Sequence, residues 1–297
     1  MAGLADFRNV IKLHRAQLVS LMENRGVGKL RTLYNEAQAD VQRKLKKLAR
    51  QHRDDTFTAH HYRMVLVQLK DGLQLIEGAI ARHLGQESRN AGMLAHKQVI
   101  SEIKAGSKAF LGHTPVLRVE QAAVAKGLYE HVEPSLIRRH QASARRYGPE
   151  VTRAVEHQMA LSMTSGDTVD DAIDRVQDTL SGERWRAERI VRTEMSYSFG
   201  VVKQASMEAV LPEIPQMKKR LVATFDDRTG QDSKDLNGQT VDVNKPFVWH
   251  VKNSKGLPTG QVVYYMQPPN RPNDREVVIP WRPEWGDAMG GLPGQAL

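Results

Sequence analysis

The stretch that decides the fold is residues 62–80, YRMVLVQLKDGLQLIEGAI, in which apolar side chains recur every three or four positions. That spacing lines up one face of an α-helix, and residues 4–21 and 30–48 repeat it. Thr58 is placed to cap the start of this helix and Gly85 to end it. Three consecutive helices with such stripes predict helical hairpins or a bundle with coiled-coil-like packing.

Glycine and proline mark the ends of the elements that follow. The predicted helices cover residues 134–147, 149–164, 169–180 and 183–210, with breaks at 112–115, 148–149, 165–167 and 181–182. After residue 211, Pro, Gly, Asn and Asp become frequent and short β-rich runs appear, which is typical of a small α+β unit with long loops. The predicted strands cover residues 220–225, 239–243, 261–266 and 276–279.

The predicted fold class is therefore α+β and predominantly α-helical. Helical hairpins or a bundle come first, and a small carboxy-terminal α+β domain with a short β-sheet follows. We divide the chain into an amino-terminal helical region (1–111), a middle helical region (118–182), the α+β domain (183–285) and a flexible tail (286–297).

Composition and charge restrict the class of protein. The 297 residues include no cysteine, which excludes disulfides, thiolate zinc sites, iron–sulfur clusters and a cysteine nucleophile. No apolar run approaches the roughly 20 residues that a membrane span needs, so we expect no membrane partner. The net charge is +9, and residues 1–160 hold 26 Lys/Arg against 15 Asp/Glu, a surplus of 11. Such an excess favours polyanions through phosphate neutralisation.

Two basic clusters account for much of this charge. The first basic cluster comprises Arg43, Lys44, Lys46, Lys47, Arg50 and Arg53, and the second comprises Arg138, Arg139, Arg145 and Arg146 beside His140. Each is either a solvated helix face or a surface that contacts double-stranded DNA. Neither cluster has interleaved aromatic residues for base stacking, so the predicted contact is to the phosphates.

The remaining polar residues predict no catalytic or metal site. His60 and His61 are adjacent, so on a helix their side chains diverge by about 100°, and His52 precedes them across a loop. Residues 26–29, GVGK, lack the spacing of a phosphate-binding loop and predict a turn between two helices. We expect no catalytic residue, no metal ion and no cofactor.

The long predicted helix at 183–210 carries two notable carboxylates. Glu188 precedes Arg192 by four residues, the favourable order for an ion pair on a helix surface. Glu194 lies at the edge of the apolar stripe, where a carboxylate needs a partner because an unpaired buried charge is costly. A structural ion pair is the favoured interpretation of Glu194, and general acid–base catalysis is the alternative.

Five short motifs follow one another between about residues 187 and 283. They are Arg192-Thr193-Glu194 on a helix, Asp226-x-Arg228-Thr229 in a turn, Leu236-x-Gly238, the pair Pro246-Phe247, and a loop with Pro268-Pro269 before a final strand at 277–280. In this order they resemble the Mu F-like head-morphogenesis family of phage minor capsid proteins. The resemblance covers about a third of the chain, and it implies structural roles for the motif residues Arg192, Thr193, Glu194, Asp226, Arg228, Thr229, Gly238, Pro246, Phe247 and Pro269.

The chain departs from the family at one set of positions. Many relatives have a histidine after the Arg-Thr turn and a His-Pro-x-Cys-x-Cys run in the closing loop. The corresponding positions here are Ser233, Arg271, Asp274 and Glu276, so a metal or disulfide clasp is replaced at every position. We expect ion pairs to tie the closing loop to the turn instead.

The resemblance implies a structural minor head protein of a tailed bacteriophage, without catalytic activity. It implies several copies in the virion, inside the head near the portal vertex, and a location in the host cytoplasm during assembly. The expected partners are the portal or major capsid protein and double-stranded DNA, and the expected roles are head assembly and DNA packaging, retention or delivery. One alternative is a DNA-binding accessory or ejection protein that acts through the basic helices. A third hypothesis is a transferase-type enzyme built around Glu194 and Arg228.

Overall fold

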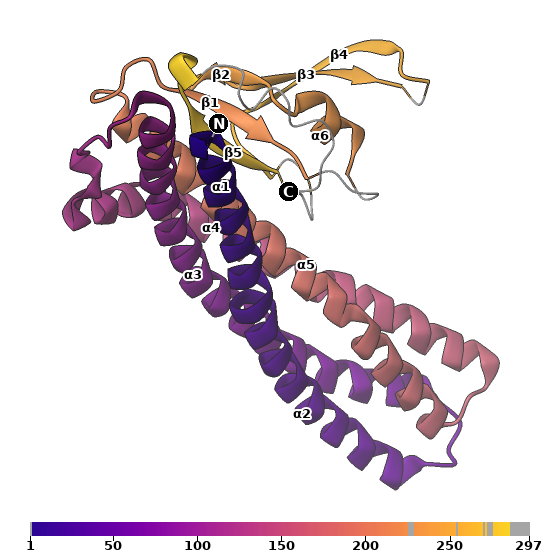
Figure 1. Cartoon of the computed structure of the whole chain (residues 1–297). Helices are drawn as coiled ribbons and strands as arrows, with labels where there is room; N and C mark the ends of the chain where they lie inside the picture. The colour runs from indigo at the N-terminus through magenta and orange to yellow at the C-terminus, as the bar shows by residue number, and fades with distance from the viewer. Residues whose placement is uncertain (1, 225–228, 254, 270, 272–275, 286–297) are drawn as a thin grey trace. The chain divides into compact units, whose positions relative to one another are not determined.

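A computed structural model describes residues 2–224, 229–253, 255–269, 271 and 276–285 of the chain (Figure 1). The helices are α1 (Ala2–Ser20), the π-helical η1 (Leu21–Val27), α2 (Gly28–His52), α3 (Ala59–Leu111), the short 3-10 helix η2 (Arg118–Glu120), α4 (Ala122–Ser165), α5 (Val169–Val210) and α6 (Gln231–Leu236). The strands are β1 (Lys218–Val222), β2 (Thr240–Asp242), β3 (Phe247–Lys252), β4 (Pro258–Tyr265) and β5 (Val277–Trp281). The predicted α+β, predominantly helical fold class is confirmed.

Contacts group the chain into two compact units, each built from separate stretches of sequence. Unit 1 comprises Met1–Met22, Ser88–Ser135 and Thr193–Leu297, and unit 2 comprises Glu23–Glu87 and Leu136–Arg192. The predicted division into consecutive regions at 1–111, 118–182 and 183–285 stays a prediction. The predicted tail at 286–297 lies outside the described residues.

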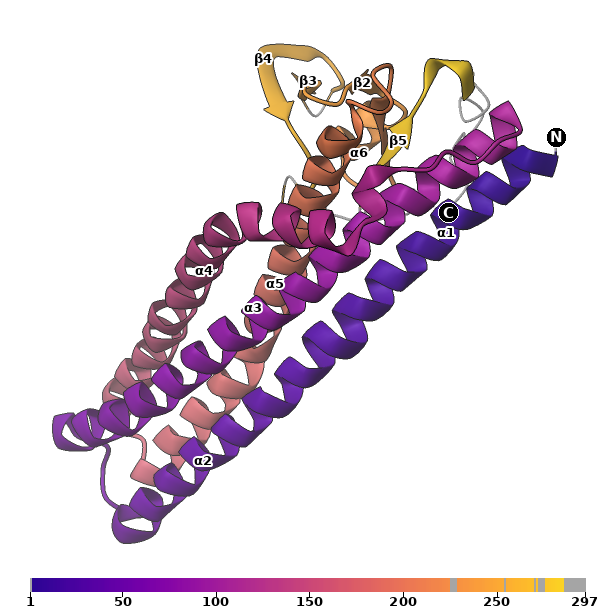
Figure 2. The same cartoon turned by 90° about the vertical axis from the view of Figure 1, so that its left-hand side faces the viewer.

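Unit 2 consists of two helical hairpins packed together (Figure 2). The turn between α2 and α3 pairs with the turn between α4 and α5 through an antiparallel bridge from Thr56 to Thr168. Inside the unit, the Tyr34 hydroxyl donates to the Leu180 carbonyl at 2.8 Å, and the Tyr147 hydroxyl donates to that of Tyr34 at 3.0 Å. These bonds satisfy the polar atoms of two buried tyrosines and connect α2, α4 and α5.

Unit 1 contains both β-sheets and a mixed core. Antiparallel pairing gives a three-stranded sheet in the order β2-β1-β5, and β3 pairs with β4 in a separate hairpin. The core joins Val99 of α3, Met207 of α5 and Leu221 of β1 to Phe247 of β3. Because β5 is buried at all five positions, it forms the covered edge of the larger sheet. Strand β3 and helix α6 were not among the predicted elements.

The helices run through several predicted breaks. Helix α3 continues past Gly85, α4 continues past Pro134 and Gly148, and α5 continues past Gly182. Gly148 allows α4 to pack closely against α3, because a Cβ at this position would collide with the carboxyl group of Glu77 on α3. The predictions of separate helices at 134–147, 149–164, 169–180 and 183–210 are therefore wrong, because packing against neighbouring helices outweighs local propensity.

The predicted turn at 26–29 is also wrong. Residues 21–27 form the π-helical segment η1, and Gly28 begins α2 directly. The buried ring of His83 on α3 forms a hydrogen bond with the Gly26 carbonyl at 2.6 Å through Nε2. A side chain of unit 2 therefore satisfies a backbone group of the π-helical segment η1. Across the described residues, no helix is both long enough and apolar enough to span a membrane.

Candidate functional site

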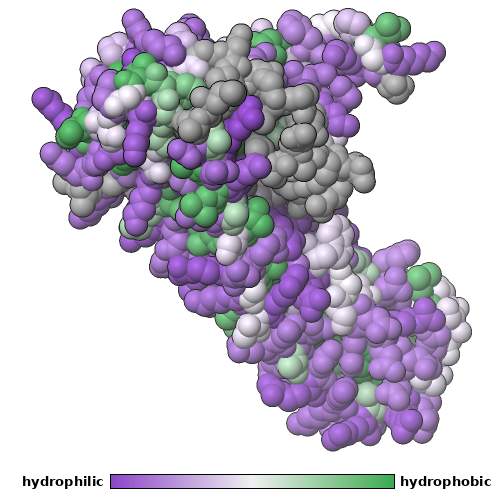
Figure 3. All heavy atoms as spheres, viewed as in Figure 1, coloured by the Kyte–Doolittle hydropathy of each residue, from purple (hydrophilic) through white to green (hydrophobic). Residues whose placement is uncertain are grey.

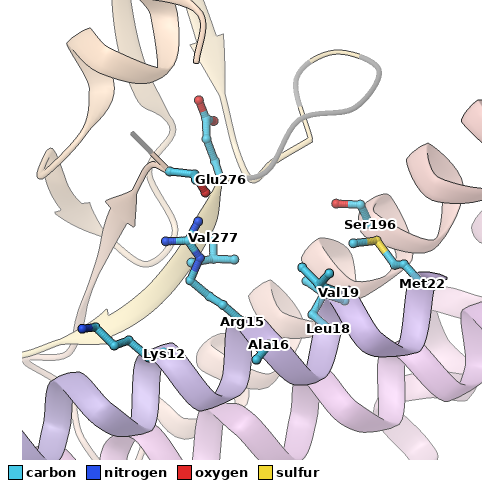
Figure 4. A pocket seen from close by; sticks show the side chains of 10 residues that line it. Lys12, Arg15, Ala16, Leu18, Val19, Met22, Ser196, Glu276 and Val277 are labelled. Carbon is cyan, nitrogen blue, oxygen red and sulfur yellow. The ribbon is translucent and has the colours of Figure 1, made fainter. Parts of the chain in front are cut away.

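A hollow of unit 1 lies between α1, α5 and β5 (Figure 4). It has a volume of about 350 Å³, near the lower end of the range for ligand pockets. Its lining residues are Lys12, Arg15, Ala16, Leu18, Val19, Met22, Ser196, Thr224, Glu276 and Val277.

The lining combines an apolar floor with charge of both signs. Arg15 rises from α1 toward β5 and ends beside Val277 and Glu276 (Figure 4). Glu276 is 4% exposed and Ser196 is 9% exposed, so their polar atoms face the protein interior. A smaller hollow shares Ser196, Glu276 and Val277 with the first and extends toward Lys203 of α5. Such a site can hold a small molecule with an apolar body and a polar end.

A buried ionic cluster in unit 1 connects α1, α3 and α5. The Lys203 ammonium donates to Glu102 Oε1 at 2.8 Å, and His14 Nδ1 lies 2.9 Å from the same oxygen. Lys203 is 2% exposed and Glu102 is 1% exposed, so each charge depends on the other for compensation. His14 lies within residues 4–21, for which the sequence predicts a helix with an apolar stripe.

Lys219 is a second buried cation of unit 1, at the centre of the three-stranded sheet. Its ammonium donates to Gln204 Oε1 at 3.0 Å and to the Met266 carbonyl at 2.7 Å. It also lies 5.2 Å from the centre of the Phe247 ring. Burial lowers the pKa of Lys219 to about 8. Sequence reasoning missed this residue because lysine in a short strand is ordinarily exposed.

Several motif residues occupy core and turn positions of unit 1. Glu194 is 3% exposed and Phe247 is fully buried, while Gly238 has a φ of +82°, a left-handed conformation that favours glycine. The Pro268–Pro269 bond is cis. Pro246 and Thr193 are half-buried.

The motif residues of the Asp-x-Arg-Thr turn are only partly described by the structure. Thr229 donates its hydroxyl to the Thr224 carbonyl. Asp226 and Arg228 lie outside the described residues. Glu194 is not among the residues that line the two hollows described above.

Two of the clasp positions meet in space although 38 residues separate them. Arg271 Nη2 donates to Ser233 Oγ at 2.8 Å, and the other terminal nitrogen pairs with Asp232. Asp232 and Ser233 lie in α6, and Arg271 lies in the closing loop. The pair between Arg271 and Asp232 therefore joins the closing loop to α6. Asp226 and Arg228 of the turn lie outside the described residues, so the predicted ion-pair tie between the loop and the turn stays a prediction.

Arg192 is the centre of an ion-pair network in unit 2. It binds Glu23 through two bonds of 2.7 and 3.0 Å, and Arg31 binds Glu188 in the same bidentate way. The predicted Glu188–Arg192 pair is confirmed at 3.3 Å. Hydrogen bonds from Arg192 lower the pKa of Glu23, and those from Arg31 lower the pKa of Glu188. The network fastens α5 to η1 and α2.

Both basic clusters belong to unit 2, but they lie at different levels of it. Helices α2 and α4 run in the same direction, because both end at the turns joined by the Thr56–Thr168 bridge. Tyr34 and Tyr147 mark one level. At 1.5 Å per residue, Arg43 lies about 13 Å beyond this level toward the bridge, and the second cluster extends from about 13 Å before it at Arg138 to the level itself at Arg146. The two clusters therefore occupy successive levels of the unit.

The cations of these clusters differ in their partners. Arg43 and Lys44 both pair with Asp40 at 3.1 Å, and Arg53 pairs with Asp170 at 3.3 Å. Six cations of the two clusters make no ion pair with any residue in the described part of the chain: Lys46, Lys47, Arg50, Arg138, Arg145 and Arg146. All six are exposed. The face of unit 2 seen in Figure 3 is largely hydrophilic.

The second cluster also contains a residue that faces inward. His140 is 3% exposed and continues the buried stripe of Leu136, Ala144 and Tyr147 on α4. Burial, with a smaller contribution from the charge of Arg139, lowers the pKa of His140 to about 4. This histidine is therefore a neutral core residue at neutral pH and adds nothing to the basic surface.

No family model matches the chain, and no curated protein or solved structure is significantly similar to it. The likeness to the head-morphogenesis family therefore rests on the five sequence motifs.

Proposed function

We propose that the chain is a structural minor head protein of a tailed bacteriophage that acts in head assembly and in packaging, retention or delivery of DNA. The observation that carries the proposal is the contact between Arg271 and Ser233. In many relatives both positions hold residues that are able to form a metal or disulfide clasp, which requires them to approach one another. The contact between Arg271 and Ser233 supports the resemblance independently, because the order and spacing of the motifs do not include it.

The environment of the motif residues supports a structural role over a catalytic one. Buried Phe247 and Glu194, the left-handed Gly238 and the half-buried Pro246 hold the core and turns of unit 1. A catalytic set would present polar atoms to a cavity where substrate can approach them. Among the described motif residues, none lines the larger hollow.

Particle fractionation tests this proposal. Heads and mature virions are purified from a lysate of the phage whose genome carries the gene, and the chain is quantified by mass spectrometry against the portal protein. We expect a fixed ratio of a few copies per portal ring, protected from added protease in intact heads. Absence from purified heads and virions, or complete digestion by the protease, would contradict the proposal.

The exposed cations of unit 2 favour one second candidate, a DNA-binding accessory or ejection protein. Lys46, Lys47 and Arg50 share one stretch of α2, and none has an acidic partner in the described chain. When unpaired cations such as these neutralise DNA phosphates, the counterions condensed on the DNA are released, and this release favours binding. The expected binding is independent of DNA sequence.

A matched pair of triple variants tests DNA contact. In the test variant Lys46, Lys47 and Arg50 become Gln; in the control, the exposed residues Lys234, Lys245 and Lys255 of unit 1 become Gln, with the same change in net charge. Fluorescence anisotropy measures affinity for a short DNA duplex at several salt concentrations. We expect the slope of log affinity against log salt to fall by about 2.7 in the test variant only, at about 0.9 per phosphate contact. Equal slopes in both variants would rule out the surface on α2.

A further inference from the structure

We propose that His52, Asp55 and His61 form a binding site for a divalent transition-metal ion, with Zn²⁺ the best-suited ion. One ligand atom from each residue lies within 4.8 Å of the other two. His52 is the last residue of α2, Asp55 lies in the turn, and His61 is in the first turn of α3. The site stands independently of the proposed function, because none of the three residues belongs to the family motifs.

The distances suit a tetrahedral ion. Asp55 Oδ2 lies 2.9 Å from His52 Nδ1 and 3.9 Å from His61 Nε2. Ligand atoms around tetrahedral zinc, with bonds of about 2.0–2.1 Å, are separated by about 3.3 Å. The two measured distances lie on either side of that value, so small side-chain movements bring all three atoms into coordination. Two imidazoles and one carboxylate are a set that zinc binds with water in the fourth position.

His61 is held in place for such a role. It is 6% exposed, and its ring stacks on Phe57 at a centroid distance of 6.2 Å. Its Nδ1 accepts a hydrogen bond from the Thr58 amide at 3.3 Å and lies 3.1 Å from Thr58 Oγ1, while Nε2 lies 3.9 Å from Asp55 Oδ2. Binding of a metal at Nε2 moves the ring proton to Nδ1, which then donates to Thr58 Oγ1 in place of accepting from the amide.

The backbone of the turn is also fixed before any ion arrives. Asp55 donates its amide to the His52 carbonyl at 3.0 Å and accepts from the Val169 amide at 2.9 Å. The Phe57 amide donates to the Asp167 carbonyl at 2.9 Å. These bonds tie the turn to the start of α5, so little conformational freedom is lost on binding. A bound ion therefore braces the end of unit 2 at which both helical hairpins turn.

The sequence did not predict this site, because its ligands come from two helices and the turn between them. The predicted divergence of the His60 and His61 side chains is wrong, since the two rings are in edge contact with centroids 5.8 Å apart, but His60 is exposed and lies outside the ligand set. The partner of His61 is His52, whose ring centre lies 5.1 Å away across the turn. That approach follows from the helical hairpin and not from a spacing along one helix.

Metal titration of two variant pairs tests the site, with full-length protein that carries no histidine tag. Asp55→Asn and His52→Gln remove one ligand each at half-buried or exposed positions, so folding is retained. Asp54→Asn and His60→Gln are the matched controls, since both residues are exposed neighbours outside the ligand set. Zn²⁺ binding is measured by isothermal titration calorimetry, and circular dichroism confirms that each variant is helical.

We expect wild-type protein and both controls to bind one Zn²⁺ per chain. Each ligand variant is expected to bind more than about 100-fold more weakly, which exceeds the 10–100-fold loss caused by removing an outer hydrogen-bond partner. Zn²⁺ is also expected to slow hydrogen exchange at the Phe57 amide in the wild type. Absence of binding at micromolar Zn²⁺, unchanged affinity in Asp55→Asn and His52→Gln, or equal losses in the controls would overturn the proposal.

Discussion

His140 makes unit 2 sensitive to acid. Because its pKa is about 4 in the folded chain and has an ordinary value of 6.5 when exposed, the unfolded chain binds a proton that the folded chain does not bind between these values. The contribution of His140 to the free energy of unfolding is therefore fully present above pH 6.5 and is lost as the pH falls toward 4. At 1.36 kcal/mol per pH unit, the loss between pH 7.5 and pH 5 is at most about 2 kcal/mol.

Urea unfolding, followed by far-ultraviolet circular dichroism at pH 7.5 and pH 5, measures this loss. Other groups titrate in the same range, so the informative quantity is the difference between wild type and His140→Gln or His140→Leu. We expect the wild type to lose up to about 2 kcal/mol more than either variant over this range. His131→Gln, at an exposed position of the same helix, is the control and should follow the wild type. If wild type and both His140 variants lose equal stability, the buried neutral histidine is not the cause.

Two buried polar contacts give further predictions. Lys203→Met is expected to lower the free energy of unfolding by about 3–5 kcal/mol, because it leaves Glu102 without its ammonium partner. The double variant Lys203→Met/Glu102→Leu should lose less in the same urea titration, and a larger loss would contradict the reasoning. Tyr147→Phe should cost about 1 kcal/mol, because it removes one donor. Tyr34→Phe should cost about 1–3 kcal/mol, because it removes the bond to Leu180 and leaves the buried Tyr147 hydroxyl without its acceptor, and urea midpoints that rank the two variants in the opposite order would refute this explanation.

Local patterns were sufficient for the helical half of the fold. Leu69, Leu73, Ile76 and Ile80 of the opening stretch are all buried, since a stripe with helical spacing needs only a partner surface to be covered. The ends of the helices were less predictable. Gly148 was interpreted as a terminator because glycine has low helix propensity, whereas its lack of a side chain allows Glu77 to approach.

The polar contacts also divide into those that spacing along one helix predicts and those that depend on the packing of different elements. The Glu188–Arg192 pair was predictable because both residues lie four apart on one helix. The bonds of Arg192 to Glu23 cross 169 positions and depend on how α5 packs beside η1. A cation on a helix surface gives no sign in the sequence of which distant carboxylate it will meet.

The sequence by itself determined the helical stripes, the absence of thiol chemistry, the two basic clusters and the order of the five motifs. These are properties of composition or of spacing within one element. Only the tertiary structure decided that the basic clusters occupy different levels, that His140 and Lys219 are buried, that Arg271 meets Ser233, and that His52 and His61 share Asp55. Each of these depends on the packing of one element against another, and burial in that packing determines which charges are compensated and which histidines face one another.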